Sequence, residues 1–170
     1  MYTSISAGEW PILPRGAVYS QYPDGKSLGS CQPLRLRSWA ADLQVVCPGG
    51  GPGVYPSINA ALSALDSQGP NSITVAGTCT ENIFLDKRER LVIQAAPGQT
   101  ATIVAADPSA IVLQTFGSQG VVLSSLVFQG GVNGVIVNQG SNVSMLNCTV
   151  QQNSSDGLVV QIGSTLVIEK

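Results

Sequence analysis

The segment Gly134-Val135-Ile136-Val137-Asn138 occurs three times in related form. It matches Ala110-Ile111-Val112-Leu113-Gln114 earlier in the chain and Gly157-Leu158-Val159-Val160-Gln161 later in it. Other apolar positions repeat at nearly the same interval: Val121 with Val143, Leu126 with Cys148, Phe128 with Val150, and Val143 with Leu166. Each repeat holds two or three strand-sized apolar segments separated by Gly, Asn, Ser or Gln. A fixed period of about 22–24 residues is typical of solenoid proteins.

The repeated strands are joined by very short connections. Consecutive strands of a parallel sheet normally need a helical crossover of a dozen or more residues, and no segment between the repeats is long enough for one. The chain avoids the crossover if it winds, so that each strand pairs with its equivalent one turn later. We therefore predict an all-β fold, a right-handed parallel β-helix over residues 43–170 with coils of about 22–24 residues. Stacking would also place Gln114, Asn138 and Gln161 in an amide ladder.

One short helix is predicted before the repeats. Pro56 suits the first position of a helix, and Ile58, Leu62 and Leu65 fall on one helical face. No other segment shows this period over a comparable length. We expect the helix at residues 56–65 to cap the N-terminal end of the apolar core.

The C-terminal end of the sequence has no such cap. Leu166-Val167-Ile168 is typical of a strand in the middle of a coil, and the sequence ends at Lys170. An uncapped stack exposes sheet edges, which favour pairing with another chain. We therefore expect either a fragment of a longer protein or self-association through the open C-terminal end.

Residues 1–42 differ in composition from the repeats. They hold both tryptophans and four of the eight basic residues, and they show no apolar period. We interpret them as an irregular N-terminal arm. Met1 to Ala7 has neither the basic start nor the apolar run of a signal peptide.

Composition excludes several classes of function. Charged residues make up 11% of the 170 residues, the net charge is -2, and there is no histidine. The absence of histidine excludes a Ser-His-Asp triad, a Cys-His pair and a histidine-ligated metal. The charge balance predicts no nucleic-acid partner, and the evenly interrupted hydropathy predicts no membrane span. No two cysteines have the spacing of a metal motif, so we expect neither metal nor cofactor.

Three segments of the N-terminal half carry a family resemblance: Tyr55-Pro56-Ser57-Ile58-Asn59-Ala60-Ala61-Leu62, Gly77-Thr78-Cys79-Thr80-Glu81-Asn82-Ile83, and Thr100-Ala101-Thr102-Ile103. They resemble the N-terminal part of pectin-lyase-like β-helix proteins, most closely the pectin methylesterases. The esterases have Gly-x-Tyr-x-Glu-Asn in the second segment, so Cys79 stands in place of the tyrosine. These segments build the cap and the first coil, and the resemblance therefore bears on the fold more than on the reaction.

The resemblance implies where an esterase site would lie. Such esterases use two aspartates, glutamines that hold an oxyanion, and an arginine on one sheet face. Aligned on the repeats, Asn133 and Ser155 replace the two glutamines, and Asp156 coincides with the general-acid aspartate. The nucleophilic aspartate would follow about one coil later, after the last residue. A lone carboxylate cannot supply both roles, so we favour an ordinary turn over a catalytic remnant at Asp156.

A polysaccharide lyase of the same superfamily would need a basic residue, often arginine, beside a uronate carboxylate. Lys87, Arg88 and Arg90 form the one basic cluster of the repeat region. Because Asp86 and Glu89 flank it, we interpret this segment as a solvated, self-paired turn.

The four cysteines have different expected roles. Cys47 and Cys79 each follow an apolar strand, and the two strands would pair in the first coil, which predicts a disulfide. Cys148 replaces Leu126 in the repeat and is predicted to be an inert core residue. Cys31 lies in the arm. The family and the disulfide together indicate a secreted or cell-surface protein.

Three functions remain open from the sequence. The first, which we favour, is a non-catalytic β-helix module of a secreted or surface protein that binds polysaccharide or acts as a structural spacer. The second is a truncated or divergent pectin-type carbohydrate esterase or polysaccharide lyase, and the third is a self-assembling structural or adhesive unit. Glycan binding requires exposed aromatic side chains. From Leu91 onward there are only Phe116 and Phe128, and Phe128 is predicted to be buried, which weakens that case.

Overall fold

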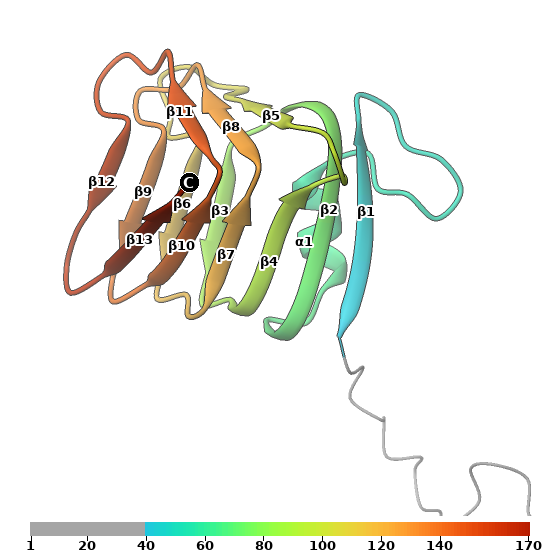
Figure 1. Cartoon of the computed structure of the whole chain (residues 1–170), viewed down its shortest axis with the longest axis horizontal. Coiled ribbons are helices and arrows are strands. Elements are labelled where there is room, and N and C mark those ends of the chain that lie inside the picture. Colours follow the sequence, from blue (N-terminus) through green and yellow to red (C-terminus); the bar gives the residue numbers. More distant parts are fainter. Residues whose placement is uncertain (1–39) are drawn as a thin grey trace, which may run out of the picture. The chain divides into compact units, whose positions relative to one another are not determined.

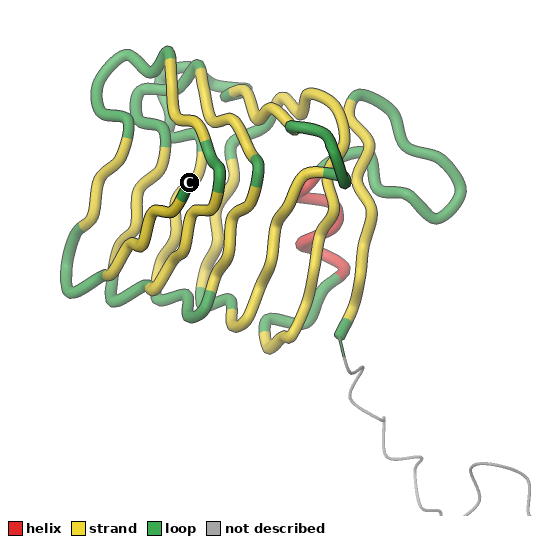
Figure 2. Tube along the Cα trace, viewed as in Figure 1, coloured by secondary structure: helices red, strands yellow, loops and turns green. Residues whose placement is uncertain are grey.

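The computed structural model describes residues 40–170, which form thirteen β-strands and one short α-helix (Figures 1 and 2). The elements are β1 (Ala41–Cys47), α1 (Ile58–Ala64), β2 (Gln68–Thr80), β3 (Ile83–Asp86), β4 (Glu89–Ala95), β5 (Ala101–Val104), β6 (Leu113–Phe116), β7 (Val121–Ser124), β8 (Leu126–Gln129), β9 (Val135–Asn138), β10 (Asn142–Leu146), β11 (Thr149–Gln151), β12 (Leu158–Val160) and β13 (Thr165–Glu169). Ala41 and Asp42, which were expected to belong to the arm, begin β1. The rest of the predicted arm lies outside the described residues, apart from residue 40. No helix within residues 40–170 has the length and apolar character needed to cross a membrane.

All pairings between these strands are parallel, and neighbours in a sheet are never consecutive in the chain apart from β1 and β2. We describe them as three rows. The first row is β1, β2, β4, β7, β10 and β13, the second is β2, β5, β8 and β11, and the third is β3, β6, β9 and β12. Figure 1 shows equivalent strands lying side by side along each row. The prediction of an all-β fold built from parallel strands is confirmed.

Strand β2 belongs to two rows because it bends at Gly77. Its first part pairs with β1 and β4, and its last three residues, Thr78–Thr80, pair with β5. Gly77 has a φ of 87°, and a Cβ atom there would lie 2.1 Å from the carbonyl oxygen of Cys47. Only glycine combines this backbone conformation with so close an approach. Gly77 therefore directs the chain from the first row into the second.

The apolar core lies between the three rows. Alternate residues of each strand point inward, as the two-residue period of a strand requires. In β4, for example, Leu91 and Ile93 are 2% and 0% exposed, whereas Val92 and Gln94 between and after them are half-buried. Phe128 of β8 is the largest fully buried side chain, as predicted.

The helix α1 starts two residues later than predicted but buries the predicted face. Ser57 is its N-cap and accepts a hydrogen bond from the N–H of Ala60 at 3.1 Å. Ile58 and Leu62 join the same buried cluster as Val45 of β1. The helix thus packs onto the start of the core, beside β1 and β2.

The strand pairing confirms most of the predicted repeat intervals and corrects one of them. Val135 pairs with Leu158 of the following repeat, as predicted. However, Asn138 lies opposite Phe116, and Gln114 lies opposite Ile136, so the preceding repeat is two residues shorter than predicted. The predicted amide ladder is therefore wrong, because Gln114 is not in register with Asn138. A shift of two residues keeps every side chain on the same face, and the apolar pattern cannot detect it.

A ladder of serines exists instead, at the turns that precede strands of the first row. Ser118 and Ser141 are 0% and 1% exposed. The N–H of Ser118 donates to Oγ of Ser141 at 3.0 Å, and the N–H of Ser141 donates to Oγ of Ser164 at 3.2 Å. The N–H of Arg88 donates in turn to Oγ of Ser118 at 3.1 Å. The Ser141 N–H also reaches the carbonyl of Asn138, at 3.3 Å. The serine hydroxyls thus give N–H groups in the turns a hydrogen-bond partner in the neighbouring repeat.

Candidate functional site

The two residues expected in an esterase site lie in adjacent turns. Asp156 is exposed in the connection between β11 and β12, and Asn133 precedes β9. Their segments meet through backbone contacts, with the N–H of Gly134 donating to the carbonyl of Asp156 at 3.0 Å. The Asp156 carboxylate accepts a long hydrogen bond of 3.5 Å from the neighbouring Ser155 hydroxyl. These are the contacts of a turn, and they give the carboxylate no partner with which to share acid–base work.

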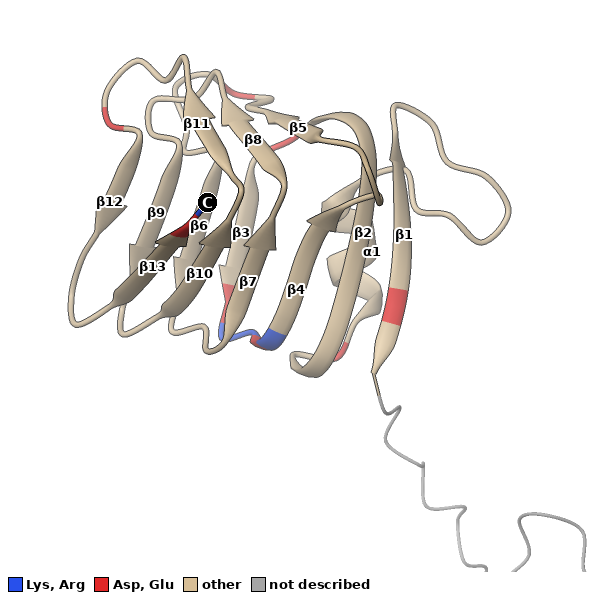
Figure 3. Ribbon diagram, viewed as in Figure 1, with Lys and Arg blue, Asp and Glu red and all other residues tan. Residues whose placement is uncertain are grey.

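The arginines of the basic cluster serve as backbone partners. The guanidinium of Arg88 donates to the carbonyls of Leu62 and Leu65 at 3.0 and 3.3 Å, at the end of α1. Arg90 donates to the carbonyl of Gly69. The prediction that this turn is self-paired is therefore wrong for the two arginines. Their guanidinium groups donate to backbone carbonyls and not to Asp86 or Glu89. Figure 3 shows the cluster at the connection between β3 and β4.

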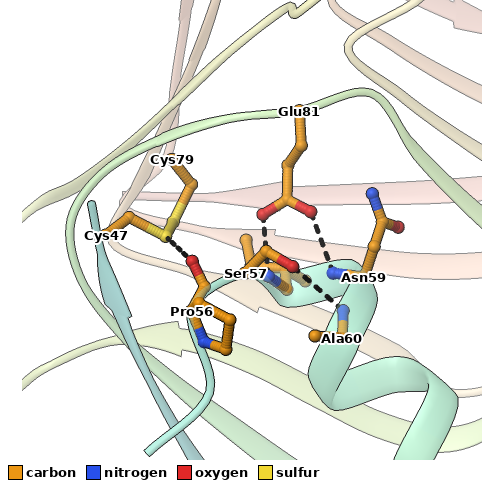
Figure 4. The surroundings of a disulfide bond; sticks show 8 residues. Cys47, Pro56, Ser57, Asn59, Ala60, Cys79 and Glu81 are labelled. Atoms are coloured by element: carbon orange, nitrogen blue, oxygen red, sulfur yellow. Dashed lines mark hydrogen bonds between the residues drawn. A yellow bond between two sulfur atoms is a disulfide. The ribbon is translucent and has the colours of Figure 1, made fainter. Parts of the chain in front are cut away.

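The predicted disulfide is present at the start of the core (Figure 4). Cys47 at the end of β1 and Cys79 in β2 have Cα atoms 4.9 Å apart. Beside them the buried carboxylate of Glu81 accepts hydrogen bonds from the N–H groups of Ile58 and Asn59, at 2.7 and 2.8 Å. With the Ser57 cap, side chains therefore satisfy three of the N–H groups that the first turn of α1 leaves open.

Cys47, Cys79 and Glu81 form the one group within residues 40–170 whose side-chain atoms are close enough together to hold a metal ion. The two sulfur atoms and a carboxylate oxygen of Glu81 lie within 4.8 Å of one another. Both sulfurs are used in the disulfide, and both oxygens of Glu81 accept helix N–H groups. The arrangement is a structural junction that fixes α1 to β1 and β2.

The third row presents a different surface, made of two columns of outward-facing side chains. The strand register places Phe84, Gln114, Ile136 and Val159 in one column, and Asp86, Phe116 and Asn138 in the other. Ile136 is nevertheless buried, at 9% exposure, so the exposed part of the first column near Phe84 ends at Gln114. Phe84 is 55% exposed, and its ring centroid lies 6.5 Å from that of Phe116, with the planes tilted by 49°. Phe116 is half-buried, so Phe84 is the more exposed ring of the pair and offers an apolar face among polar groups.

A hollow of about 420 Å³ opens beside Phe84. Its walls come from β3, from β6 and from the loop before β6, with the lining residues Asn82, Ile83, Phe84, Ser109, Ala110, Ile111, Gln114 and Val132. Asn82 fixes this loop, because its Nδ2 donates to the carbonyl of Ile111 at 2.8 Å and its Oδ1 accepts from the N–H of Asp107 at 2.8 Å. The pocket wall is therefore held in place without a ligand.

Phe84 is the residue that sequence reasoning missed. The sequence predicts a strand at Ile83-Phe84-Leu85, but three consecutive apolar residues do not show which of them faces outward. Ile83 and Leu85 are 2% and 0% exposed, so alternation sends Phe84 to the outer face. The two-residue period of a strand could have placed Phe84 on the opposite face from Ile83 and Leu85. It was hard to recognise because both faces of this segment are apolar.

Comparison with protein-family models, with curated proteins and with solved structures finds no match to this chain. The resemblance to pectin-lyase-like proteins therefore rests on the three segments quoted above. The surface of the third row remains as the candidate site, because the other candidate residues have structural roles in turns or at α1.

Proposed function

We propose that this chain is a non-catalytic right-handed parallel β-helix, a module of a secreted or cell-surface protein that binds polysaccharide. The winding is supported by the three parallel rows, in which each strand pairs with its equivalent from the next repeat. A short α-helix at the start of the core supports the predicted N-terminal cap. The same features support a place in the pectin-lyase-like superfamily.

The outward Phe84–Phe116 pair beside the hollow is the observation that carries the functional proposal. Sugar rings have apolar C–H faces that pack on aromatic rings, and hydroxyl edges that need polar partners. Phe84 supplies the ring, while Gln114 and Ser109 line the hollow with amide and hydroxyl groups. A concave apolar surface with a few fixed polar groups is the general form of a ligand site.

The non-catalytic part of the proposal is supported by the contacts of the alternative site residues. Asp156 is a turn residue, and Arg88 is occupied by helix carbonyls. The disulfide between Cys47 and Cys79 is compatible with an extracellular location.

The binding site is tested by replacing Phe84 with alanine. We expect the wild-type chain to bind at least one polysaccharide of a panel. Phe84→Ala should bind it at least about tenfold more weakly, because losing an aromatic ring that the bound sugar covers costs about 1.4 kcal/mol or more. Isothermal titration calorimetry with oligosaccharides of the selected polymer measures this. Val46→Ala is the control, because Val46 is also exposed, at 42%, but lies on the first row. Equal binding by Phe84→Ala, or no binding by the wild type, would contradict the proposal.

The absence of catalysis is tested separately on pectins. We expect the folded chain to release neither methanol nor unsaturated uronate from methylated and unmethylated pectin. Within residues 40–170 the hydrogen-bond partner of the Asp156 carboxylate is the neighbouring Ser155 hydroxyl, and the Arg88 guanidinium is engaged by helix carbonyls. Colorimetric methanol assays and absorbance of the unsaturated product detect the two reactions. Methanol release that disappears in Asp156→Asn would identify an esterase, and unsaturated product would identify a lyase. Either result would overturn the non-catalytic assignment.

A further inference from the structure

The hollow beside Phe84 is lined by uncharged side chains. Its walls within residues 40–170 are apolar apart from the amide and hydroxyl groups of Asn82, Ser109 and Gln114. Such groups exchange hydrogen bonds with sugar hydroxyls, but none of them carries the positive charge that a desolvated carboxylate or sulfate needs as a partner. The hollow therefore has polar contacts to offer but no cation to hold an anionic ligand.

A negative charge lies at the edge of the hollow, on Asp107. Its carboxylate accepts hydrogen bonds from the hydroxyl and the N–H of Ser109, at 2.6 and 2.9 Å, and Ser109 is one of the lining residues. These hydrogen bonds lower the pKa of the Asp107 carboxyl, so the group is charged at neutral pH. The N–H of Asp107 donates to Oδ1 of Asn82 at 2.8 Å, which holds the charged residue beside the start of β3.

The basic residues within residues 40–170 lie elsewhere. Arg88 and Arg90 donate to backbone carbonyls at the end of α1 and at the start of β2. Lys87 comes after the end of β3, whereas the hollow lies at the start of that strand, and the neighbouring exposed carboxylate of Asp86 offsets its charge. Lys170 follows β13 of the first row. The charge of Asp107 therefore has no counterpart at the hollow.

A uronate sugar placed on the Phe84 ring would meet two penalties. Its carboxylate would lose water at a place where no cation replaces the water. It would also approach Asp107, and two like charges about 6 Å apart in water repel enough to weaken binding about threefold. A neutral sugar avoids both penalties, because its C–H face packs on the ring and its hydroxyls need only the amide and hydroxyl groups of the walls.

We propose that the Phe84 site selects uncharged polysaccharides and rejects polyuronates and other anionic polymers, with Asp107 as a specificity-determining residue. The inference rests on the polysaccharide binding proposed above and names the class of polymer that is bound. Neutral hexose chains belong to the accepted class, as does a polyuronate whose carboxyl groups are all methyl-esterified. The free acid of the same polyuronate is excluded.

Matched pairs of polymers test the selection. A panel of neutral hexose polymers is compared with the same polymers oxidised at C6 to uronates, and methyl-esterified polygalacturonate is compared with its free acid. We expect the polymer that binds most tightly to be uncharged, and its anionic counterpart to bind at least about tenfold more weakly, since desolvation and repulsion add. Isothermal titration calorimetry with oligosaccharides of each pair measures both affinities.

The outcomes separate this inference from the binding proposal itself. An anionic form that binds as tightly as its neutral counterpart, and loses that binding in Phe84→Ala, would overturn the charge selection and leave the polysaccharide site in place. No binding to any member of the panel, or binding that Phe84→Ala leaves unchanged, would contradict the site and the selection together.

The salt dependence of binding gives the sign of the interaction without a substitution. Affinity of the wild type for the anionic form should rise, or become detectable, between about 20 and about 500 mM NaCl, because salt screens repulsion between charges. Affinity for the neutral form should not change. An affinity for the anionic form that falls with added salt would show net attraction and would overturn the proposal.

Asp107→Asn tests the residue that we hold responsible. Asparagine keeps an Oδ1 that accepts from the N–H of Ser109 but removes the charge, so the affinity ratio of anionic to neutral form should rise about threefold. Asp66→Asn is the control, because Asp66 accepts from the N–H of Gln68 at 3.1 Å in a similar turn, but between α1 and β2. It should leave the ratio unchanged. An unchanged ratio in Asp107→Asn, or an equal rise in both variants, would contradict the role of Asp107.

Discussion

Gly77→Ala is expected to destabilise the fold by about 3 kcal/mol or more, the largest loss we predict for a single methyl group in this chain. Two effects add at this position. The φ of 87° is unfavourable for any residue with a side chain, and the new Cβ would lie 2.1 Å from the carbonyl oxygen of Cys47. That oxygen cannot move away freely, because β1 pairs with β2 along its whole length and Cys47 is held by the disulfide.

Urea denaturation followed by far-ultraviolet circular dichroism measures this loss. Gly98→Ala is a matched control, because Gly98 has a similar φ of 72° but no atom within 4 Å of the position of a Cβ. Gly98→Ala should lose only the stability that the unfavourable φ costs, about 1 kcal/mol, because its Cβ meets no other atom. Equal losses in the two variants would mean that the close approach of β2 to Cys47 does not matter for stability.

The bend at Gly77 also shows what kind of information the sequence carries. The repeat period predicts the parallel strands, because each repeat has to bury the apolar face of its strands. This requirement recurs in every repeat and therefore leaves a clear pattern in the sequence. The position of the bend depends on a local backbone conformation and on a contact with Cys47, which lies in a different strand, β1. A glycine alone does not identify such a contact, since the chain has 19 glycines.

Register and polar networks were less predictable than the strands. Apolar alternation assigned inward and outward positions but did not distinguish between repeat lengths that differ by two residues, so the amide ladder was misplaced. The serine ladder could have been found, because Ser118, Ser141 and Ser164 recur at a constant interval. Serine is common in turns, however, and its repetition did not stand out from turn composition.

The candidate site was predicted least well. Alternation places Phe84 on the face opposite to Ile83 and Leu85, but all three residues are apolar, so which face is the outer one follows only once the third row is known. The hollow beside it joins residues 82–84 to residues 109–114 and Val132, which are far apart in sequence. In contrast, the pairing of Cys47 with Cys79 was predictable, because β1 and β2 pair in parallel and place Cys47 opposite Gly77, two residues before Cys79.

Removing the disulfide with the double variant Cys47→Ser, Cys79→Ser is the second large effect that we expect. The bond closes a loop with a sequence separation of 32 residues, and constraining a loop of this length in the unfolded chain is worth about 3–4 kcal/mol. The junction would also lose a fixed point beside Glu81, whose carboxylate holds the first turn of α1. The unfolded-chain effect lowers the stability of the whole fold, and the lost fixed point should add a local loss at the N-terminal end of the core.

Urea denaturation gives the total loss, and hydrogen exchange gives its location. The amides of α1 should lose protection before those of β6 and β9, because only α1, β1 and β2 meet at the junction. Cys148→Ser is the control, since Cys148 is a free cysteine whose Sγ lies 3.3 Å from the carbonyl of Leu123, a partner that a serine hydroxyl can also reach. Burial raises the pKa of the Cys148 thiol, so it is neutral at pH 7 and its replacement changes no charge. Uniform loss of protection across all three rows would show instead that the strands unfold as one unit and that the disulfide acts only through the unfolded chain.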